Sequence, residues 1–561
     1  MKHKAKWMGL ALAGAALSGC GAILGLDDFT EGATTTQGGG GQGGGTVGST
    51  GGSPACQQSE TMVCNTGLEG ACALGKATCK ADGSAYDTCV PDLTPNTAAE
   101  DCTKLGDENC DGVACSECVW SFLAGDASGA LPTAIEFDSA GNIFVLGSFS
   151  GTLKLLNRSN DTSIVLNAAS SSSTVLSKFS PNGDVIWAKS FGTTNSGGFS
   201  NSMAVDAGGS VFIAGQASGD ADFGSGTFTN PGSAYAFVAK FDAAGAPKWS
   251  RQFSSSGNGQ PTSTTGIAID PNGDVVVGGW LNGTVKFDAI AFSQAIGYDA
   301  FVTKLAGTTG VVSWAKQFKE PSGTTDVDQF VESLTIDGSG NIFLAGFFRG
   351  SILLNTILTT VGGSDDLDVF VAKLDPNGNP SWSTGFGTTT NDTPNDIAVD
   401  GSGNVLVTGM VGGSTNFGGG VVSAPGSSSQ NAFVVKYTNA STYVNARILQ
   451  ADSGVSLDAD GADNIYLSGF TTRIIDLGGG ALPYGGFNDM FLTKLDAGLG
   501  HVWSKEFGDA KRQSAEAARY DKTTKSVVVA SSVSGNVDFG TGLLTAAGAD
   551  MINLGLAKFQ P

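Results

Sequence analysis

The segments SMAVD (202–206), VFIAG (211–215), FVAKF (237–241) and KWSRQF (248–253) are four short apolar stretches joined by two tight turns and one longer connection. Each has the length of a β-strand, and a turn that begins at an Asp separates the first two. The same order of segments returns along the chain, so this stretch is one copy of a repeat.

The repeat occurs seven times, and each copy has an Asp at the end of its first segment. Successive Asp residues lie 60 to 68 residues apart. They are Asp138, Asp206, Asp270, Asp337, Asp400, Asp460 and Asp521. An apolar segment with a Lys follows each Asp by 34 to 40 residues, at Lys178, Lys240, Lys304, Lys373, Lys436, Lys494 and Lys558. One Asp and one Lys in every copy indicate architecture rather than a sevenfold substrate site.

A Trp segment follows the Lys in most copies, at Trp187, Trp249, Trp314, Trp382 and Trp503, and the fifth copy has Val444 there. No Trp follows Lys558, whereas Trp120 stands ahead of the first Asp. We therefore predict that the strand at Trp120 is the outer strand of the last copy and closes the ring. Seven such four-stranded units form a β-propeller.

The predicted fold is all-β, with a seven-bladed β-propeller over 119–561 preceded by a small disulfide-rich module. A Gly count of 84 and a charged fraction of 15% suit many short strands with tight turns. Turns such as DPNGD (270–274) place Asp where its carboxylate accepts backbone N–H bonds and Gly where φ is positive. We interpret them as hairpin turns rather than calcium loops.

The motifs Ala-Val-Asp, Phe-Val-Ala-Lys and DFG (222–224, again at 538–540) resemble the bacterial β-propeller repeat family SBBP. The resemblance extends over the seven copies. It implies an exported, often surface-associated protein with no settled biochemical activity.

Residues 1–19 have the pattern of a secretory signal, because three lysines precede an apolar run that is too short to span a bilayer. LSGC (17–20) resembles the lipobox of bacterial lipoproteins, which implies acyl chains such as palmitate on Cys20. An ordinary signal peptide with a chance Cys is the alternative. Since Gly21 rather than Asp follows, we expect the outer membrane or cell surface rather than the inner membrane.

Residues 20–55 contain the lipidated Cys and a flexible Gly-rich linker. Removal of the signal leaves 27 basic and 52 acidic residues, a formal charge of −25. This charge argues against nucleic acid as a partner. We expect a monomer that contacts the membrane through its lipid.

Nine cysteines lie in residues 56–118, where an exported, loop-rich segment predicts disulfides. They are Cys56, Cys64, Cys72, Cys79, Cys89, Cys102, Cys110, Cys115 and Cys118. The odd number leaves one thiol over. Zinc held by the last three cysteines is the alternative.

Asp107, Asn109 and Asp111 match the first half of a calcium loop, with Gly112 at the turn position, but the bidentate Glu is missing. Calcium is therefore the one cofactor considered, and an Asx-rich turn is the alternative. The segment also resembles a cysteine-rich motif of exported bacterial proteins to which metal binding is ascribed.

Catalysis is disfavoured because the mature chain has one His, His501, and no carboxylate motif. We expect a non-enzymatic, lipid-anchored surface protein that presents the propeller as a scaffold for protein or glycan. A structural role in the envelope, or a carboxylate- or calcium-dependent enzyme, is the alternative. Variable loops on a rigid scaffold carry recognition, which favours residues 157–173 and 319–331.

Overall fold

The computed structural model describes residues 61–65, 74–78, 80, 90–91, 118–125, 129–169, 171–192, 199–230, 232–255, 261–292, 295–322, 327–426, 430–548 and 551–560. They form two compact units. In the smaller unit, β1 (Thr61–Asn65), β2 (Leu74–Thr78) and β3 (Val90–Pro91) form one antiparallel sheet. Within the described ranges there is no apolar helix of membrane-spanning length.

Several predicted sites fall outside these ranges. Cys20 and the three calcium-loop residues Asp107, Asn109 and Asp111 lie outside the described residues, as do seven of the nine cysteines. The other two are Cys64, in β1, and Cys118, in the propeller.

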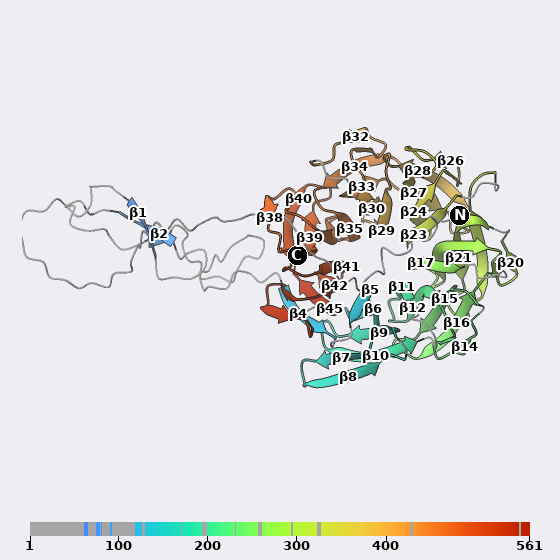
Figure 1. Ribbon diagram of the computed structural model, residues 1–561, viewed down its shortest axis with the longest axis horizontal. Helices are drawn as coiled ribbons and strands as arrows, with labels where there is room; N and C mark the ends of the chain where they lie inside the picture. The colour runs from blue at the N-terminus through green and yellow to red at the C-terminus, as the bar shows by residue number, and fades with distance from the viewer. Residues whose placement is uncertain are drawn as a thin grey trace, which may run out of the picture. The chain divides into compact units, whose positions relative to one another are not determined.

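The larger unit is a ring of seven blades, each a four-stranded antiparallel sheet (Figure 1). The all-β, seven-bladed prediction is therefore confirmed. The first strand of each blade lies innermost, and these inner strands pack against one another around the axis of the ring. Blades are numbered 1 to 7 from the blade that contains Asp138.

The strands of blades 1 to 7 have the following bounds. The inner strands are β5 (Ala130–Phe137), β11 (Phe199–Val205), β17 (Thr262–Ile269), β23 (Gln329–Ile336), β29 (Thr393–Val399), β35 (Ser453–Ala459) and β41 (Gln513–Asp521). The second strands are β6 (Ile143–Phe149), β12 (Val211–Ala217), β18 (Val275–Gly283), β24 (Ile342–Arg349), β30 (Val405–Val411), β36 (Ile465–Thr471) and β42 (Ser526–Val533). The third strands are β9 (Ser173–Phe179), β15 (Tyr235–Phe241), β21 (Ala295–Leu305), β27 (Leu367–Leu374), β33 (Asn431–Tyr437), β39 (Asp489–Leu495) and β45 (Asn553–Phe559). The outer strands are β10 (Val185–Gly192), β16 (Pro247–Phe253), β22 (Val312–Phe318), β28 (Pro380–Phe386), β34 (Tyr443–Leu449), β40 (His501–Phe507) and, for blade 7, β4 (Cys118–Ala124).

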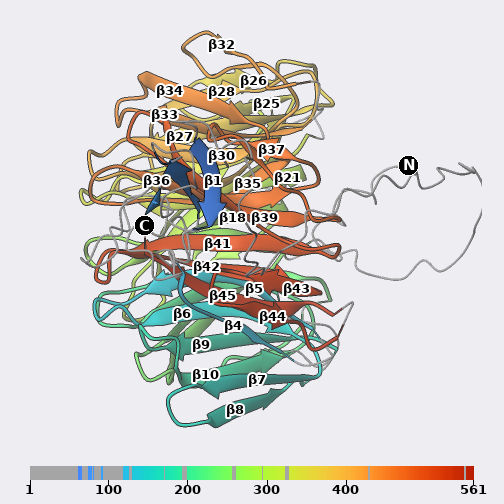
Figure 2. The same ribbon diagram turned by 90° about the vertical axis from the view of Figure 1, so that its left-hand side faces the viewer.

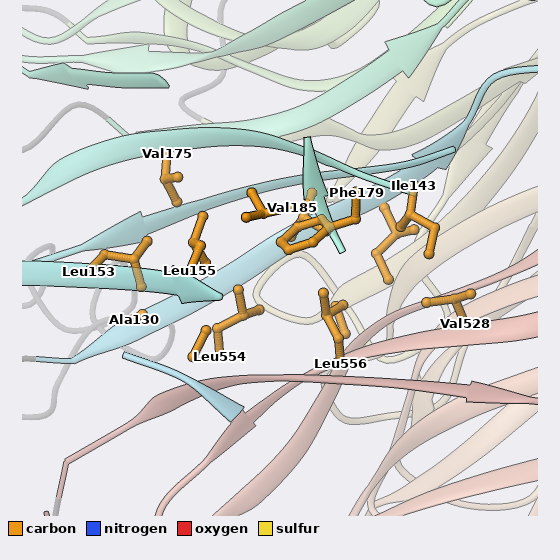
Figure 3. Close-up of a cluster of buried hydrophobic side chains, with 14 of the residues drawn as sticks. Ala130, Ile143, Leu153, Leu155, Val175, Phe179, Val185, Val528, Leu554 and Leu556 are labelled. Carbon is orange, nitrogen blue, oxygen red and sulfur yellow. The ribbon is translucent and has the colours of Figure 1, made fainter. Parts of the chain in front are cut away.

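An N-terminal strand closes the ring, as predicted. β4 pairs antiparallel with β45, which places Trp120 opposite Lys558. Blades 7 and 1 then share one apolar core, in which Leu554 and Leu556 of blade 7 cluster with Ile143 and Phe179 of blade 1 (Figure 3).

Two details of the repeat differ from the prediction. β4 begins at Cys118, so this buried cysteine belongs to the propeller rather than to the module before it. In blade 5, Lys436 lies opposite Asn445, so Asn445 and not Val444 takes the Trp position. The strand edges near the third turn contain a bulge, which shifts the alignment by one residue.

In every blade, the connection between the second and third strands contains a short two-stranded hairpin that the apolar pattern did not predict. From blade 1 to blade 7 these are β7 (Thr152–Asn157) with β8 (Thr162–Asn167), β13 (Ala221–Asp222) with β14 (Thr227–Phe228), β19 (Lys286–Phe287) with β20 (Ile290–Ala291), β25 (Ser351–Leu353) with β26 (Ile357–Thr359), β31 (Thr415–Asn416) with β32 (Val421–Val422), β37 (Ile475–Asp476) with β38 (Ala481–Leu482), and β43 (Asn536–Asp538) with β44 (Leu543–Thr545). Most of these strands have two or three residues, too few for a periodic pattern to show.

The outer strands of blades 7, 1, 2, 3 and 4 bond to the third turn of the next blade through a Trp. The Trp249 indole Nε1 and the Lys240 Nζ both donate to the carbonyl oxygen of Gly307, at 3.1 and 2.8 Å. The corresponding indole bonds are Trp120 to Pro181, Trp187 to Ala243, Trp314 to Pro376 and Trp382 to Asn439. We call this set of bonds the inter-blade latch. In blade 5 the Asn445 side-chain amide donates to the Gly498 carbonyl at 2.7 Å instead.

A glycine of the third turn lies against the latch Trp of the preceding blade. Gly310 has a φ of +70°, and a Cβ built on it would lie 2.6 Å from the Trp249 ring. This position therefore requires glycine for two reasons, the backbone conformation and the close approach of the ring.

We expect Gly310→Ala to destabilise the fold more than Gly273→Ala. Both glycines have positive φ, so both substitutions strain the backbone by about 1–2 kcal/mol. Only at Gly310 would the added methyl strike the Trp249 ring, since nothing lies within 4 Å of a Cβ on Gly273. Overpacking should add about 1–3 kcal/mol, measured by denaturant unfolding. Equal losses in the two variants would show that the Trp249 ring does not constrain the turn.

Candidate functional site

The antiparallel strand order gives the ring two different faces. The first turn of every blade and the third turns of blades 1 to 6 emerge on one face, and the second connections and the links between blades start from the other. We call these the turn face and the hairpin face. In Figure 2 the hairpin β7–β8 lies outside the outer strand β10, which it contacts.

The polar residues of the turn face are engaged within the fold. Asp138 Oδ1 accepts hydrogen bonds from the backbone N–H groups of Ala140 and Asn142, both at 3.0 Å. Lys178 Nζ lies 2.9 Å from Asp138 Oδ2, and Lys304–Asp270 and Lys436–Asp400 form the same ion pair. Burial opposes ionisation of Asp138, but the bonds from Asn142 and Lys178 outweigh it and hold its pKa below the usual range.

The inner strands carry a charged cluster around Arg519 of β41. Arg519 Nη1 lies 2.8 Å from Asp396 Oδ2 of β29, and Nε lies 3.8 Å from Glu136 Oε1 of β5. The hydroxyls of Ser333 and Ser456 donate to the two Asp396 oxygens, at 3.1 and 3.2 Å. We call these residues the axial cluster. It joins five of the seven blades.

Burial raises the pKa of Glu136 to about 7, although Arg519 opposes the shift. Burial likewise raises the pKa of Glu332, at the bulge of β23, to about 7. Sequence reasoning did not predict this cluster, although one feature of the repeat pointed to Glu136 and Arg519. Two residues before the repeat Asp, three copies have Ala, whereas others have Glu136, Asp458 and Arg519.

His501 begins the outer strand of blade 6, and its Nε2 lies 3.0 Å from Ser504 Oγ. The same serine position bonds to the hairpin in other blades, with Ser250 to Ser225 at 2.6 Å and Ser383 to Asn355 at 2.5 Å. Ser504 therefore occupies a position that attaches hairpins to outer strands.

The hairpins and the connections next to them present large apolar side chains to solvent. The hairpins run along the outer strands, so that their tips lie beside the third-turn ends of those strands: Ser159 N–H donates to Asp184 Oδ1 at 3.0 Å, and Gly419 lies against Tyr443. Val421 is 70% exposed, Leu543 69% and Phe487 68%, and Val165, Ile357, Val361 and Ile474 are also exposed. Buried carboxylates accept hydrogen bonds from backbone N–H groups of these connections. Asp392 Oδ1 accepts the Gly412 N–H at 2.7 Å, and Asp368 Oδ2 accepts the Val361 N–H at 2.6 Å. Burial raises the pKa of each of these two carboxyls to about 6.

The two loops favoured by the sequence belong to the second connection of blade 1 and to the link between blades 3 and 4, and their predicted bounds overlap strands. Residues 157–173 include β8 and the start of β9, and residues 319–331 include the start of inner strand β23. Within the first, Ser159 N–H donates to Asp184 Oδ1 at 3.0 Å, and in the second, residues 323–326 lie outside the described ranges. Among the described residues, no three His, Cys, Asp or Glu side chains are placed to hold a metal ion.

One family model and several solved structures are similar to this chain. Residues 381–418 match the family model described as SBBP, beta-propeller repeat. No curated protein matches the chain. Among solved structures, the chain is similar to the propeller of Dos1, with 8% identity over 78% of this chain and 94% of that one and a TM-score of 0.38. It is also similar to BamB from Moraxella catarrhalis, with 11% identity, coverage of 79% and 99%, and a TM-score of 0.33. A protein of unknown function from Bacteroides caccae matches with 12% identity, coverage of 59% and 89%, and a TM-score of 0.32. The segment from the outer strand of blade 4 to the hairpin of blade 5 therefore matches the SBBP repeat model, within a chain that folds as a seven-bladed propeller.

Proposed function

We propose that this protein is an exported, lipid-anchored surface protein whose propeller binds an extracellular protein or glycan through its exposed hairpins, without catalysing a reaction. The observation that carries the proposal is the difference between the hairpins and the first and third turns. Those turns are occupied by Asp caps, Lys–Asp pairs and the inter-blade latch. The hairpins vary from blade to blade and expose apolar side chains on a short, supported backbone.

Exposed apolar residues on a supported loop favour recognition, because burying them against a partner is favourable and little conformational entropy is lost. Val421 and Leu543 occupy matching positions in the hairpins of blades 5 and 7. Thr227 takes this position in blade 2, so the apolar choice is not imposed by the repeat.

Two features support a non-enzymatic role. Arg519 and the serine hydroxyls satisfy Asp396 in the axial cluster, which leaves that carboxylate engaged in structure. His501 contacts a serine whose position attaches hairpins in other blades. Lipid anchoring is supported by the lipobox resemblance at Cys20 and by the secretory pattern before it.

Substitution of the exposed hairpin residues Ile357, Val421 and Leu543 by Ser should abolish capture of the partner. The partner is sought by glycan array and by pull-down from detergent-solubilised envelope. The matched control exchanges Val311 and Val444, which are also exposed but belong to a third turn and an outer strand rather than to a hairpin. It should keep binding, and both variants should keep the wild-type melting temperature. Binding that survives the hairpin exchange, or fails in the control alone, would contradict the proposed role of the hairpins.

Cys20→Ala should release the protein from the membrane fraction, because the acyl chains would be lost. Partitioning into detergent phase measures the change. Unchanged partitioning of the variant would refute the lipid anchor. It would not bear on partner binding, which the preceding experiment tests separately.

Arg519→Met should destabilise the ring by about 3 kcal/mol, because Asp396 would remain buried without its cation. Adding Asp396→Asn should restore part of this loss. Urea unfolding of the two variants measures the difference. If the double variant is no more stable than Arg519→Met, Arg519 acts through packing and not through Asp396.

A further inference from the structure

The loop at 484–488 of blade 6 exposes Phe487 to solvent, and hydrogen bonds and close backbone contacts fix the loop on both sides of this residue. Gly485 N–H donates to Asp489 Oδ2, and the carbonyl of Asn488 accepts the Gln513 N–H at 2.7 Å. A Cβ on Gly486 would lie 2.5 Å from the Cα of Ala510, so the loop lies directly on the link to blade 7. Phe487, between these anchors, is 68% exposed.

Two carboxyl groups meet beneath this loop. Asp489 is fully buried, and Glu506 is hydrogen-bonded to it from the neighbouring strand β40. Asp489 Oδ1 and Glu506 Oε1 are both buried, and no donor group gives either oxygen a hydrogen bond if both carboxyl groups are ionised. An ionised carboxylate only accepts hydrogen bonds, so the contact requires a proton on one of the two groups.

Blade 3 has the neutral version of this pair at the same positions. Phe301 pairs with Gln317 as Phe491 pairs with Glu506, and the Asp lies two residues before the Phe in both blades. There the Gln317 amide donates to Asp299 Oδ2 at 2.6 Å. Glu506 thus stands where blade 3 has a permanent donor, and it can donate only when protonated.

We propose that a proton shared between Asp489 and Glu506 holds the loop 484–488 in place, and that its loss at alkaline pH releases Phe487. Two ionised carboxylates at this contact would repel each other and disturb the Asp489 oxygen that accepts the Gly485 N–H. Gly508 lies against the pair as well, and a Cβ on it would lie 2.1 Å from Asp489 Oδ1, so the site leaves Asp489 little room to turn away.

The charges around the pair fit this mechanism. Burial, together with Asp489, raises the pKa of Glu506 to about 8. Tyr484 lies near Asp489 and also near Asp452, which is paired with Arg473 at 2.9 Å. On the link that covers the loop, Lys511 lies near Asp509. Since the folded state keeps a proton that the unfolded chain releases near its ordinary pKa, the stabilisation should decline between about pH 4.5 and pH 8.

The test follows opening of the loop directly, without a ligand. Chymotrypsin cleavage after Phe487 is measured from pH 7 to pH 9.5 in the full-length protein and in Glu506→Gln, which copies the pair of blade 3. The ratio of wild-type to variant cleavage cancels the pH dependence of the protease. It should rise several-fold with pH, whereas a constant ratio would overturn the proposal.

Hydrogen exchange supplies a second measurement that needs no variant. After correction for intrinsic exchange, the Gly485 amide should lose protection above pH 8. The Gly478 amide, held by Asp476 Oδ1 at 2.7 Å in the same blade, should not. Equal changes at the two amides would contradict the proposal. That Phe487 takes part in recognition rests on the proposed function, but both measurements report on the loop alone, so the two ideas can fail separately.

Discussion

The ring depends on a backbone carbonyl oxygen at most of its blade interfaces. At five interfaces between described blades, a third-turn carbonyl oxygen accepts the indole N–H of the preceding blade, and at Gly307 and Pro181 it also accepts a lysine ammonium. Hydrogen bonds from charged donors contribute about 1.5–3 kcal/mol, roughly twice the contribution of neutral ones. The third-turn glycine, the Trp and the Lys are therefore constrained together, which explains why they recur in register along the chain.

Much of the fold could be predicted because its turns and strands follow local sequence patterns that repeat in every blade. Asp-led turns and five-residue apolar segments are visible in the sequence, and the displaced Trp120 indicates ring closure. The Trp position of blade 5 was placed one residue early because no Trp marks it, although the nine-residue interval from Lys240 to Trp249 points to Asn445 when counted from Lys436. Most hairpins of the second connections were missed because strands of two or three residues carry no pattern.

The candidate sites were harder to predict, because they join residues from several blades. Arg519 and Asp396 are 123 residues apart and come from blades 7 and 5, so they meet only when the inner strands are arranged around the axis. Asp489 and Glu506 are closer in sequence, but their contact follows from the strand register. In both cases the informative signal is a departure from the repeat: a charge where other copies have Ala, and Glu506 where blade 3 has Gln317.

The pairing of β4 with β45 joins the ends of the propeller, and Ser121 and Thr541, 420 residues apart, are in hydrogen-bond contact there. During synthesis β4 emerges before every other propeller strand, and its partner emerges after all of them. The edge of β45 must stay available for β4, and β4 must avoid the six other third strands, which present a similar apolar edge. Correct closure is thus a competition between one distant partner and several nearer ones. The early completion of each neighbouring blade by its own outer strand removes those competitors in order.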